Sequence, residues 1–338
     1  MQFTNRIGCV PDMEACTRIM QNKFAYEEKI LTRLPDVWRQ LLAAGSLNVG
    51  IVEDLGRPPD NRIVAFGASV FVTDQFMREA QSDPAPYLSA RVIRRHLQGE
   101  SPVLSLPAIR RANSGAGLNL IVLYHDMDRG VMSLEEVAFA GKHLAEAFVE
   151  IHSGYHVKEI LIEAYSEDDL SWTVHNSAYR IRSDYSSYYE SRGLPIPPPH
   201  CHPYLAGITR EEFIATHGGT LLNALFLYTP PQFFFKPREQ ELLAHALKGE
   251  TDEELGASLC VSLSAVKKRW STIYERVEAR QPELLPVADA ENSSTGQKRG
   301  VEKRHHLLRY LRQHPEELRP VEQPSAETVR VRASGRTE

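Results

Sequence analysis

The chain has 338 residues, a length that suggests about two domains. Its composition, with 42% hydrophobic and 25% charged residues, is typical of a globular protein, and its net charge of -5 excludes a uniformly basic nucleic-acid-binding protein. Four cysteines without any Cys-x-x-Cys pair exclude a disulfide framework and favour a reducing compartment.

No segment of the sequence predicts secretion or insertion into a membrane. The N-terminal residues lack the basic segment followed by an apolar stretch that marks a signal peptide. The most apolar run, at 221–228, is far too short to span a bilayer. We therefore expect a cytoplasmic protein with no membrane partner.

Residues 1–230 alternate strand-like and helix-like segments, which predicts an α/β domain with a mixed α+β sheet. The predicted strands are 2–9, 48–53, 62–73, 118–124, 158–163, 179–182 and 221–228. The predicted helices are 13–20, 27–44, 134–152 and 167–177. The segment 184–209, which contains four tyrosines and a proline-rich loop, is predicted to be an insertion or lid.

After Pro230 and Pro231 the strand signals vanish, which predicts a small all-α domain at 234–285. The small polar residues of 286–300 indicate a linker. A basic amphipathic helix is expected within 301–319, helical over 301–313, and a disordered tail over 320–338.

The segment 236–277 carries the start and stop signals of short helices. Pro237 stands where a first helix begins, and Gly249 stands where it ends. Thr251 then begins a second helix, and Glu254 three residues later completes a capping box.

A third helix follows a tight turn, with either Ser262 or Ser264 as its N-cap. Its periodicity directs four apolar side chains inward: Val266, Trp270, Ile273 and Tyr274. Lys267, Lys268 and Arg269 point outward near the start of this helix. A short helix, a tight turn and a helix with basic residues near its N-terminus is the geometry for docking in a major groove.

This segment resembles the LuxR-type DNA-binding domain. Its P-R-E start, E-L-L, G-E-T-D-E-E-L, V-S-x-S-x-V-K and I-Y-E-R-V stretches follow the order of that family, with departures at Ala265 and Arg269. The resemblance implies binding to double-stranded DNA, with Lys267 and Lys268 on phosphates or base edges. It also places three further residues along the groove-facing surface: Ser264, Arg269 and Thr272. The alternatives are a merely solvated helix face and a module for protein interaction.

The order of predicted elements in residues 1–183, with a closing strand near 221–228, resembles the GNAT-type N-acetyltransferase fold. The resemblance lies in the opening I-G-C-V-P-D-M-E-A, the paired strands at 48–73, and the alternating strands and helices from 118 to 182. In that family a Gln/Arg-x-x-Gly-x-Gly/Ala pattern opens the central helix, and its backbone N–H groups hold the pyrophosphate of coenzyme A.

That pattern aligns with 136–141 of this chain. Gly141 matches it, but Glu136 brings negative charge to a phosphate site, and Phe139 places a bulky ring where the backbone must approach closely. His175 aligns with the tyrosine that acts as general acid in the family. The resemblance thus leaves Gly141 as a degenerate cofactor-binding candidate and His175 as a catalytic candidate, and we expect neither acyl-CoA nor another cofactor to be bound.

These patterns together predict a DNA-binding transcription regulator with a GNAT-like domain that senses an unknown small molecule. Binding as a homodimer is expected, because DNA half-sites mirror protein symmetry. The alternative is an active acyl-CoA-dependent N-acyltransferase that the helix-turn-helix directs to its target.

Three weaker patterns remain. His200, Cys201 and His202 are metal-ligand types, but neighbours in an extended segment point apart and no second cluster completes the set, so no metal site is expected. Tyrosines of 184–209 line a pocket or pack on the domain. Four basic residues of the 301–313 helix contact either DNA or a partner chain: Lys303, Arg304, Arg309 and Arg312.

Overall fold

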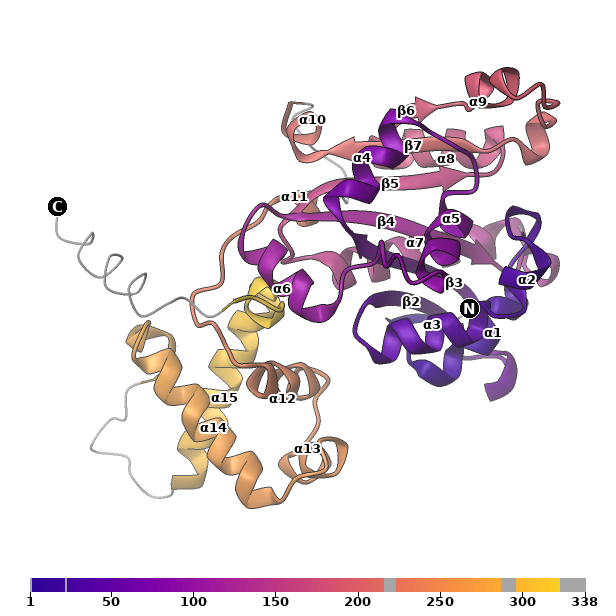
Figure 1. Cartoon of the computed structure of the whole chain (residues 1–338). Coiled ribbons are helices and arrows are strands. Elements are labelled where there is room, and N and C mark those ends of the chain that lie inside the picture. The colour runs from indigo at the N-terminus through magenta and orange to yellow at the C-terminus, as the bar shows by residue number, and fades with distance from the viewer. Residues whose placement is uncertain (1, 22, 216–222, 287–295, 323–338) are drawn as a thin grey trace. The chain divides into compact units, whose positions relative to one another are not determined.

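The computed structural model describes the chain except for residues 1, 22, 216–222, 287–295 and 323–338. The chain divides into two compact units, Met1–Leu227 and Tyr228–Glu338, which we call the first unit and the second unit and describe separately (Figure 1). Within the described ranges, no helix has both the length and the apolar character needed to cross a membrane.

The first unit is built on a seven-stranded sheet in the order β1-β2-β3-β4-β5-β7-β6. The strands are β1 (Phe3–Ile7), β2 (Leu47–Asp54), β3 (Ile63–Val72), β4 (Leu118–Met127), β5 (Val157–Ala164), β6 (Arg180–Ser183) and β7 (Tyr204–Thr209). Neighbouring strands are antiparallel except for the parallel pair β4 and β5. The sheet and its helices confirm the mixed α/β architecture that we predicted for this part of the chain.

Helices lie on both faces of this sheet, because alternate strand residues point to opposite sides. One core contains Phe66 and Val70 of β3 together with side chains of α1 (Met13–Ile19), α3 (Leu34–Ala43), α4 (Asp74–Ser82) and α5 (Leu88–Leu97). On the other face, Ala65 of β3 packs with Ala140 and Leu144 of the long helix α7 (Leu134–His152). The shorter helices are α2 (Glu28–Leu31), α6 (Leu106–Ser114), α8 (Glu167–Ser177), α9 (Ser186–Ser191), α10 (Arg210–Ala215) and α11 (Asn223–Phe226).

The two parallel strands part toward their C-terminal ends. Pairing of β4 with β5 runs only from Leu118↔Val157 to Val122↔Ile162. Beyond this point β4 stays paired with β3 and β5 stays paired with β7.

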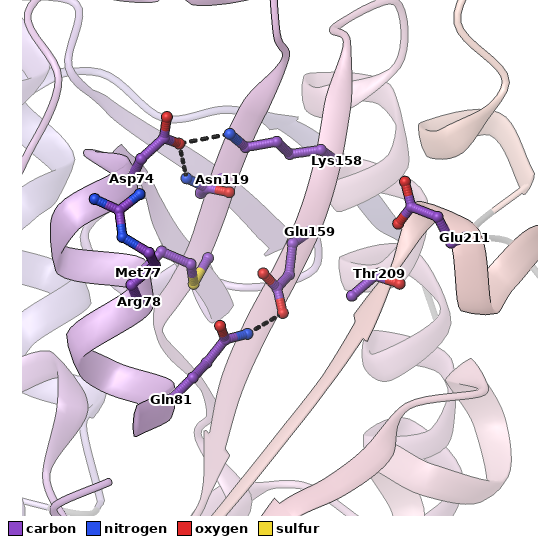
Figure 2. Close-up of a pocket in the computed structure, with 9 residues that line it drawn as sticks. All are labelled: Asp74, Met77, Arg78, Gln81, Asn119, Lys158, Glu159, Thr209 and Glu211. Atoms are coloured by element: carbon purple, nitrogen blue, oxygen red, sulfur yellow. Dashed lines mark hydrogen bonds and ion pairs between the residues drawn. The ribbon is translucent and has the colours of Figure 1, made fainter. Parts of the chain in front are cut away.

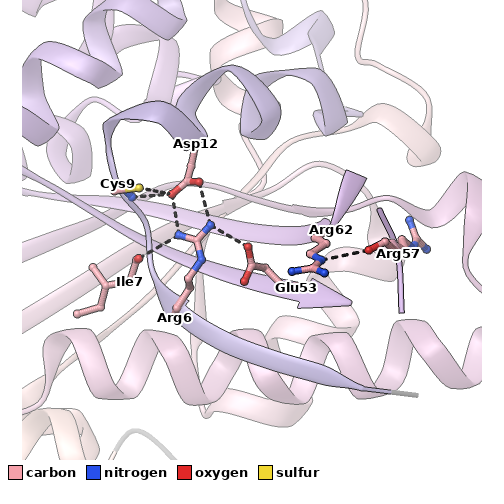
Figure 3. Close-up of polar contacts among 7 residues, drawn as sticks. All are labelled: Arg6, Ile7, Cys9, Asp12, Glu53, Arg57 and Arg62. Atoms are coloured by element: carbon pink, nitrogen blue, oxygen red, sulfur yellow. Dashed lines mark hydrogen bonds and ion pairs between the residues drawn. The ribbon is translucent and has the colours of Figure 1, made fainter. Parts of the chain in front are cut away.

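An ionic cluster joins the first strand to its neighbours (Figure 3). The Arg6 guanidinium donates to both carboxylate oxygens of Asp12, at 2.7 and 2.8 Å, and to Glu53 of β2 at 2.9 Å. Burial alone would raise the pKa of Asp12, but hydrogen bonds from Arg6 and Cys9 lower it to about 2. Asp12 therefore stays ionised at neutral pH and fixes the start of α1 against β1.

One predicted strand is wrong, and its true counterpart lies in the predicted insertion. Residues 223–226 form helix α11, so 221–228 is not the closing strand, and residues 216–222 lie outside the described part. The strand that enters the sheet beside β5 is β7, from within 184–209. A short apolar run has no periodicity that separates a strand from a buried helix, which explains the error.

The second unit is helical where the structure describes it. Its helices are α12 (Pro237–Leu247), α13 (Asp252–Ser258), α14 (Leu263–Glu278) and α15 (Gly296–Gln313). Leu307 and Leu311 of α15 are buried in one core with residues of the other three helices. The predicted basic helix therefore begins earlier than expected, inside the predicted linker, and belongs to this core. Most of that linker and most of the predicted tail lie outside the described residues.

Candidate nucleic-acid interface and coenzyme site

The N-terminus of α14 is defined by two serines. Ser262 is the N-cap, because its Oγ accepts a hydrogen bond from the backbone N–H of Ala265 at 3.3 Å. The hydroxyl of Ser264 lies 2.9 Å from that of Ser262 and is exposed. Of the two serines predicted as caps, Ser262 holds that position, and Ser264 stands beside the positive end of the helix dipole.

One side of α14 is locked into the unit. Val266, Trp270 and Ile273 are buried, as predicted from the periodicity. Trp270 Nε1 donates to Asp252 of α13 at 3.2 Å. Arg304 of α15 lies over the Trp270 ring at 4.9 Å and donates to the same carboxylate at 2.8 Å. Helix α14 is therefore held by the helices before and after it.

The opposite side of α14 presents two lysines. Lys267 and Lys268 are exposed, and no carboxylate in the described part of the chain lies within ion-pair distance of either ammonium. Arg269 is only partly exposed, and the Thr272 hydroxyl donates to the carbonyl of Lys268 at 3.1 Å. The five residues predicted to contact DNA thus lie on one helix. Among them, Lys267 and Lys268 are the exposed residues whose positive charge has no carboxylate partner in the described part of the chain.

The basic residues of α15 divide into two groups. Lys303 pairs with Glu278 of α14 at 2.5 Å, and Arg304 is engaged with α13 and Trp270. Arg309 and Arg312 remain exposed. Lys303 and Arg304 therefore hold α15 within its own unit.

The N-terminus of α7 is the place where the predicted resemblance would put a coenzyme pyrophosphate. The Ser133 hydroxyl caps α7 by accepting from the N–H of Glu136 at 3.3 Å, and the Glu136 carboxylate accepts from the N–H of Ser133 at 2.7 Å. This backbone hydrogen bond lowers the pKa of Glu136. Two backbone N–H groups that would face a phosphate are thus bonded to the helix's own cap, and Glu135 adds a second acidic side chain.

The aligned glycine lies elsewhere on the helix. Gly141 is in the interior of α7 and buried, where backbone N–H groups bond within the helix. Phe139 is 47% exposed. His175 lies in α8, and its side chain is outside the described residues.

The residues at the start of α7 do not fit the pyrophosphate of coenzyme A. An anion at a helix N-terminus needs free backbone N–H groups and the positive end of the dipole. Here Glu136 and Glu135 supply negative charge at that end, and the capping box uses two of the N–H groups.

A buried carboxyl group on β5 was not predicted from the sequence. Glu163 is 5% exposed and accepts hydrogen bonds from the N–H groups of Tyr87 and Leu88, both at 2.8 Å, where α5 begins. The hydroxyl of Tyr185 donates to it at 2.7 Å. Burial raises the pKa of Glu163 to about 7, although these hydrogen bonds act against the rise.

Glu163 therefore fastens α5 and the segment before α9 to the sheet. Tyr87 and Tyr185, the residues before these helices, both have left-handed backbones, with φ of 65° and 56°. The sequence does contain a signal for this buried carboxyl group. The alternation in Lys-Glu-Ile-Leu-Ile-Glu places Glu159 and Glu163 on one face of a buried strand.

The 184–209 segment is packed on the first unit. Tyr185 and Tyr189 are buried in the core, so for these two tyrosines the packing alternative holds. His202 is buried, and its Nε2 lies 2.7 Å from the carbonyl oxygen of Asp184. Across the described ranges, no group of three or more His, Cys, Asp or Glu side chains is arranged to hold a metal ion.

Comparisons with known proteins add similarities of structure only. No family model matches the chain, and no curated protein is similar to it in sequence. NAA60 of Arabidopsis thaliana, in complex with acetyl-CoA, is 14% identical, covering 62% of this chain and 98% of its own, with a TM-score of 0.32. Mutant forms of the spermidine/spermine N-acetyltransferase SpeG of Vibrio cholerae are 8% identical over 64% of this chain and 99% of their own, with a TM-score of 0.34.

The mosquito protein named arylalkylamine N-acetyltransferase like 5b is 9% identical to this chain. The match covers 62% of this chain and 100% of the mosquito chain, with a TM-score of 0.37. The mixed α/β fold of the first unit rests on its own sheet topology.

Proposed function

We propose that this protein is a DNA-binding regulator that contacts double-stranded DNA through α14 of its second unit. The observation that supports this most is the pair of exposed lysines without carboxylate partners, Lys267 and Lys268, on the outer side of a helix whose inner side is locked into the core. The preceding α13 and the turn at 259–262 complete the helix-turn-helix arrangement that docks a helix in a major groove.

The physical basis is charge and rigidity. Each lysine placed on a phosphate releases bound counterions, so affinity falls with salt in proportion to the number of such contacts. The Trp270–Asp252 hydrogen bond and the Arg304 contact keep α14 in place without DNA. As part of this proposal the protein binds as a homodimer, which presents two copies of α14 to successive half-sites.

Replacement of Lys267 and Lys268 together by alanine is expected to weaken binding to duplex DNA by about 100-fold and to reduce the slope of log affinity against log salt by about 2. Fluorescence anisotropy with a labelled duplex at several salt concentrations measures both quantities. Lys248→Ala is the matched control, because Lys248 is an exposed lysine just after α12. Unchanged affinity in the double variant would leave the second unit as a protein-interaction module or a merely solvated face.

For the first unit we propose a role in sensing a small molecule that biases DNA binding. A ligand acts in this way only through different affinities for the two states of the protein. The competing function is acyl transfer from acyl-CoA, and the capping box at the start of α7 argues against it.

Titration calorimetry with acetyl-CoA is expected to give no detectable heat of binding at two temperatures, because Glu136 occupies the helix N-terminus that would receive the pyrophosphate. Injection of acetyl-CoA into buffer without protein serves as the control for heats of dilution. Binding with micromolar affinity would instead make the acyltransferase the leading function of the first unit.

A further inference from the structure

One arginine of α15 contacts three other parts of the second unit. Nη1 of Arg304 donates to the carboxylate of Asp252, at the start of α13, at 2.8 Å, and its Nη2 donates to the carbonyl oxygen of Glu250 at 2.5 Å. The guanidinium carbon lies 4.9 Å from the centre of the Trp270 ring of α14. A single side chain of α15 thus joins the turn before α13, α13 itself and α14.

The contact with α14 runs through two groups of Trp270. Its Nε1 donates to the same carboxylate oxygen of Asp252 at 3.2 Å, and Arg304 covers its ring. The ring also stacks on Tyr274, with centroids 5.6 Å apart. Because Asp252 accepts from both Trp270 and Arg304, a movement of one of these three side chains disturbs the contacts of the other two.

The geometry suits an arginine in particular. A planar guanidinium donates to two acceptors at once and stacks on an aromatic face, whereas a lysine ammonium is a point charge on a flexible chain. The face of a tryptophan ring attracts a cation above it. The side chain of Arg304 is only 23% exposed, so solvent screens these interactions less than on an open surface.

Two lysine pairs show what this arrangement adds. Lys303, the neighbour of Arg304, meets Glu278 of α14 at 2.5 Å, and Lys158 of β5 meets Asp74 of α4 at 2.5 Å (Figure 2). The acids of these pairs are 43% and 56% exposed. Exposed ion pairs contribute little to the fixing of two elements against each other.

Trp270 relates this network to the two exposed lysines of α14. Trp270 is buried, whereas Lys267 and Lys268 lie on the outer side of the same helix. Residues of one helix keep fixed directions relative to one another. A rotation of α14 about its axis would therefore turn the lysines and, at the same time, move the Trp270 ring away from Asp252 and Arg304.

We propose that Arg304 is a positioning residue for DNA binding, which sets the orientation of α14 through Trp270 and contacts no DNA itself. The inference rests on the proposed DNA-binding function, and the two fail in different ways. A wild-type protein that does not bind duplex DNA would overturn both. An Arg304 variant that binds as tightly as a DNA-binding wild type would overturn the positioning role alone.

The test is fluorescence anisotropy of the full chain with a labelled duplex at several salt concentrations, at a temperature where every variant is folded. Arg304→Ala is expected to bind roughly tenfold more weakly, as suits the loss of a cation over a mostly buried ring. The slope of log affinity against log salt should stay the same, because no phosphate contact is lost. Arg238→Ala removes an exposed arginine of α12 and is the control, with an affinity expected to match the wild type.

Two results would contradict the positioning role. A slope reduced by about 1 in Arg304→Ala would mean that Arg304 contacts a phosphate directly. Unchanged affinity would mean that Arg304 serves stability only, because lower stability reduces the folded fraction and not the affinity of the folded molecules. If Arg304→Ala does not fold, Arg304→Gln, with a longer side chain, replaces it under the same two criteria.

Further variants locate the effect in Trp270. Arg304→Lys keeps the charge without the planar fork, so it should restore only part of the affinity; full restoration would mean that charge alone acts. Trp270→Phe combined with Arg304→Ala should lose less than the sum of the two single effects, because both act through one contact. By NMR without DNA, the indole N–H resonance of Trp270 is expected to shift in Arg304→Ala, and an unchanged resonance would overturn the proposal.

Discussion

Replacement of Leu307 by alanine is expected to destabilise the second unit by about 3 kcal/mol, within the range for removing a buried leucine side chain. Leu307 is fully buried, and it packs in one core with residues of α12, α13 and α14. If α15 were only an arm that touches DNA or a partner, the loss of this side chain would not affect the rest of the unit. Urea denaturation measures the free energy of unfolding, and hydrogen exchange assigns the loss to residues of the second unit.

Arg312→Ala is the matched control on the same helix. Arg312 is exposed, so its removal is expected to change the free energy of unfolding by no more than about 0.5 kcal/mol. A Leu307→Ala protein with the stability of the wild type would mean that α15 does not belong to the core. The same pair of variants bears on DNA binding, because a loosened core would release α14 through its contact with Arg304.

Local signals predicted the helices of the second unit well. The capping box of Thr251 and Glu254 is present, with the N–H of Thr251 donating to Glu254 at 2.7 Å. Gly249 has the left-handed backbone, φ 91°, expected of a residue that ends a helix. Caps and terminators act between residues that are close in sequence, so the sequence alone identifies them.

The errors in the first unit arose where distant segments decide the structure. The apolar run at 221–228 satisfies strand and helix patterns equally, and only the space left beside β5 selects β7 as the paired strand. We predicted no element between 74 and 117, where the structure has α4, α5 and α6. Their apolar faces are short, and their burial against the sheet, rather than propensity, stabilises them.

The candidate sites show the same contrast between features that neighbouring residues determine and features that distant segments determine. The outward position of Lys267 and Lys268 followed from helical periodicity, because a helix places its inward and outward residues by spacing alone. Gly141, which the alignment matches to a phosphate-binding glycine, lies inside the helix that we predicted at 134–152 and that the structure has as α7. The surroundings of Glu159 depend on Gln81 of α4 and Arg182 of β6, which no local pattern brings together.

The stability of the first unit is expected to fall as the pH rises from about 5 to 8, because of Glu163. Its pKa is raised by burial to about 7 in the folded protein, against an ordinary value of 4.5. Between these two values the folded state keeps a proton that the unfolded state releases, so raising the pH favours unfolding. The full contribution is present below pH 4.5, is lost as the pH passes through 7, and amounts to about 3 kcal/mol.

The carboxylates with lowered pKa values do not interfere in this range. Asp12 and Glu212 have folded pKa values of about 2, so their stabilising effect is present above the ordinary carboxyl value and is lost only as the pH falls toward 2. Between pH 5 and 8 both are ionised in the folded and the unfolded states. Histidines that titrate in this range are common to the wild type and to any Glu163 variant, so their effect cancels in a comparison.

Glu163→Gln separates this titration from every other one. The amide cannot ionise, and its nitrogen faces a donor such as the N–H of Leu88, so we expect the variant to be less stable than the wild type at pH 5 by about 1 to 3 kcal/mol. As the pH rises to 8 the wild type loses stability and the variant does not, so the difference must shrink or reverse. Urea denaturation at pH 5, 6, 7 and 8 measures it. Parallel curves for the two proteins would show that Glu163 does not titrate there and that its hydrogen bonds outweigh its burial.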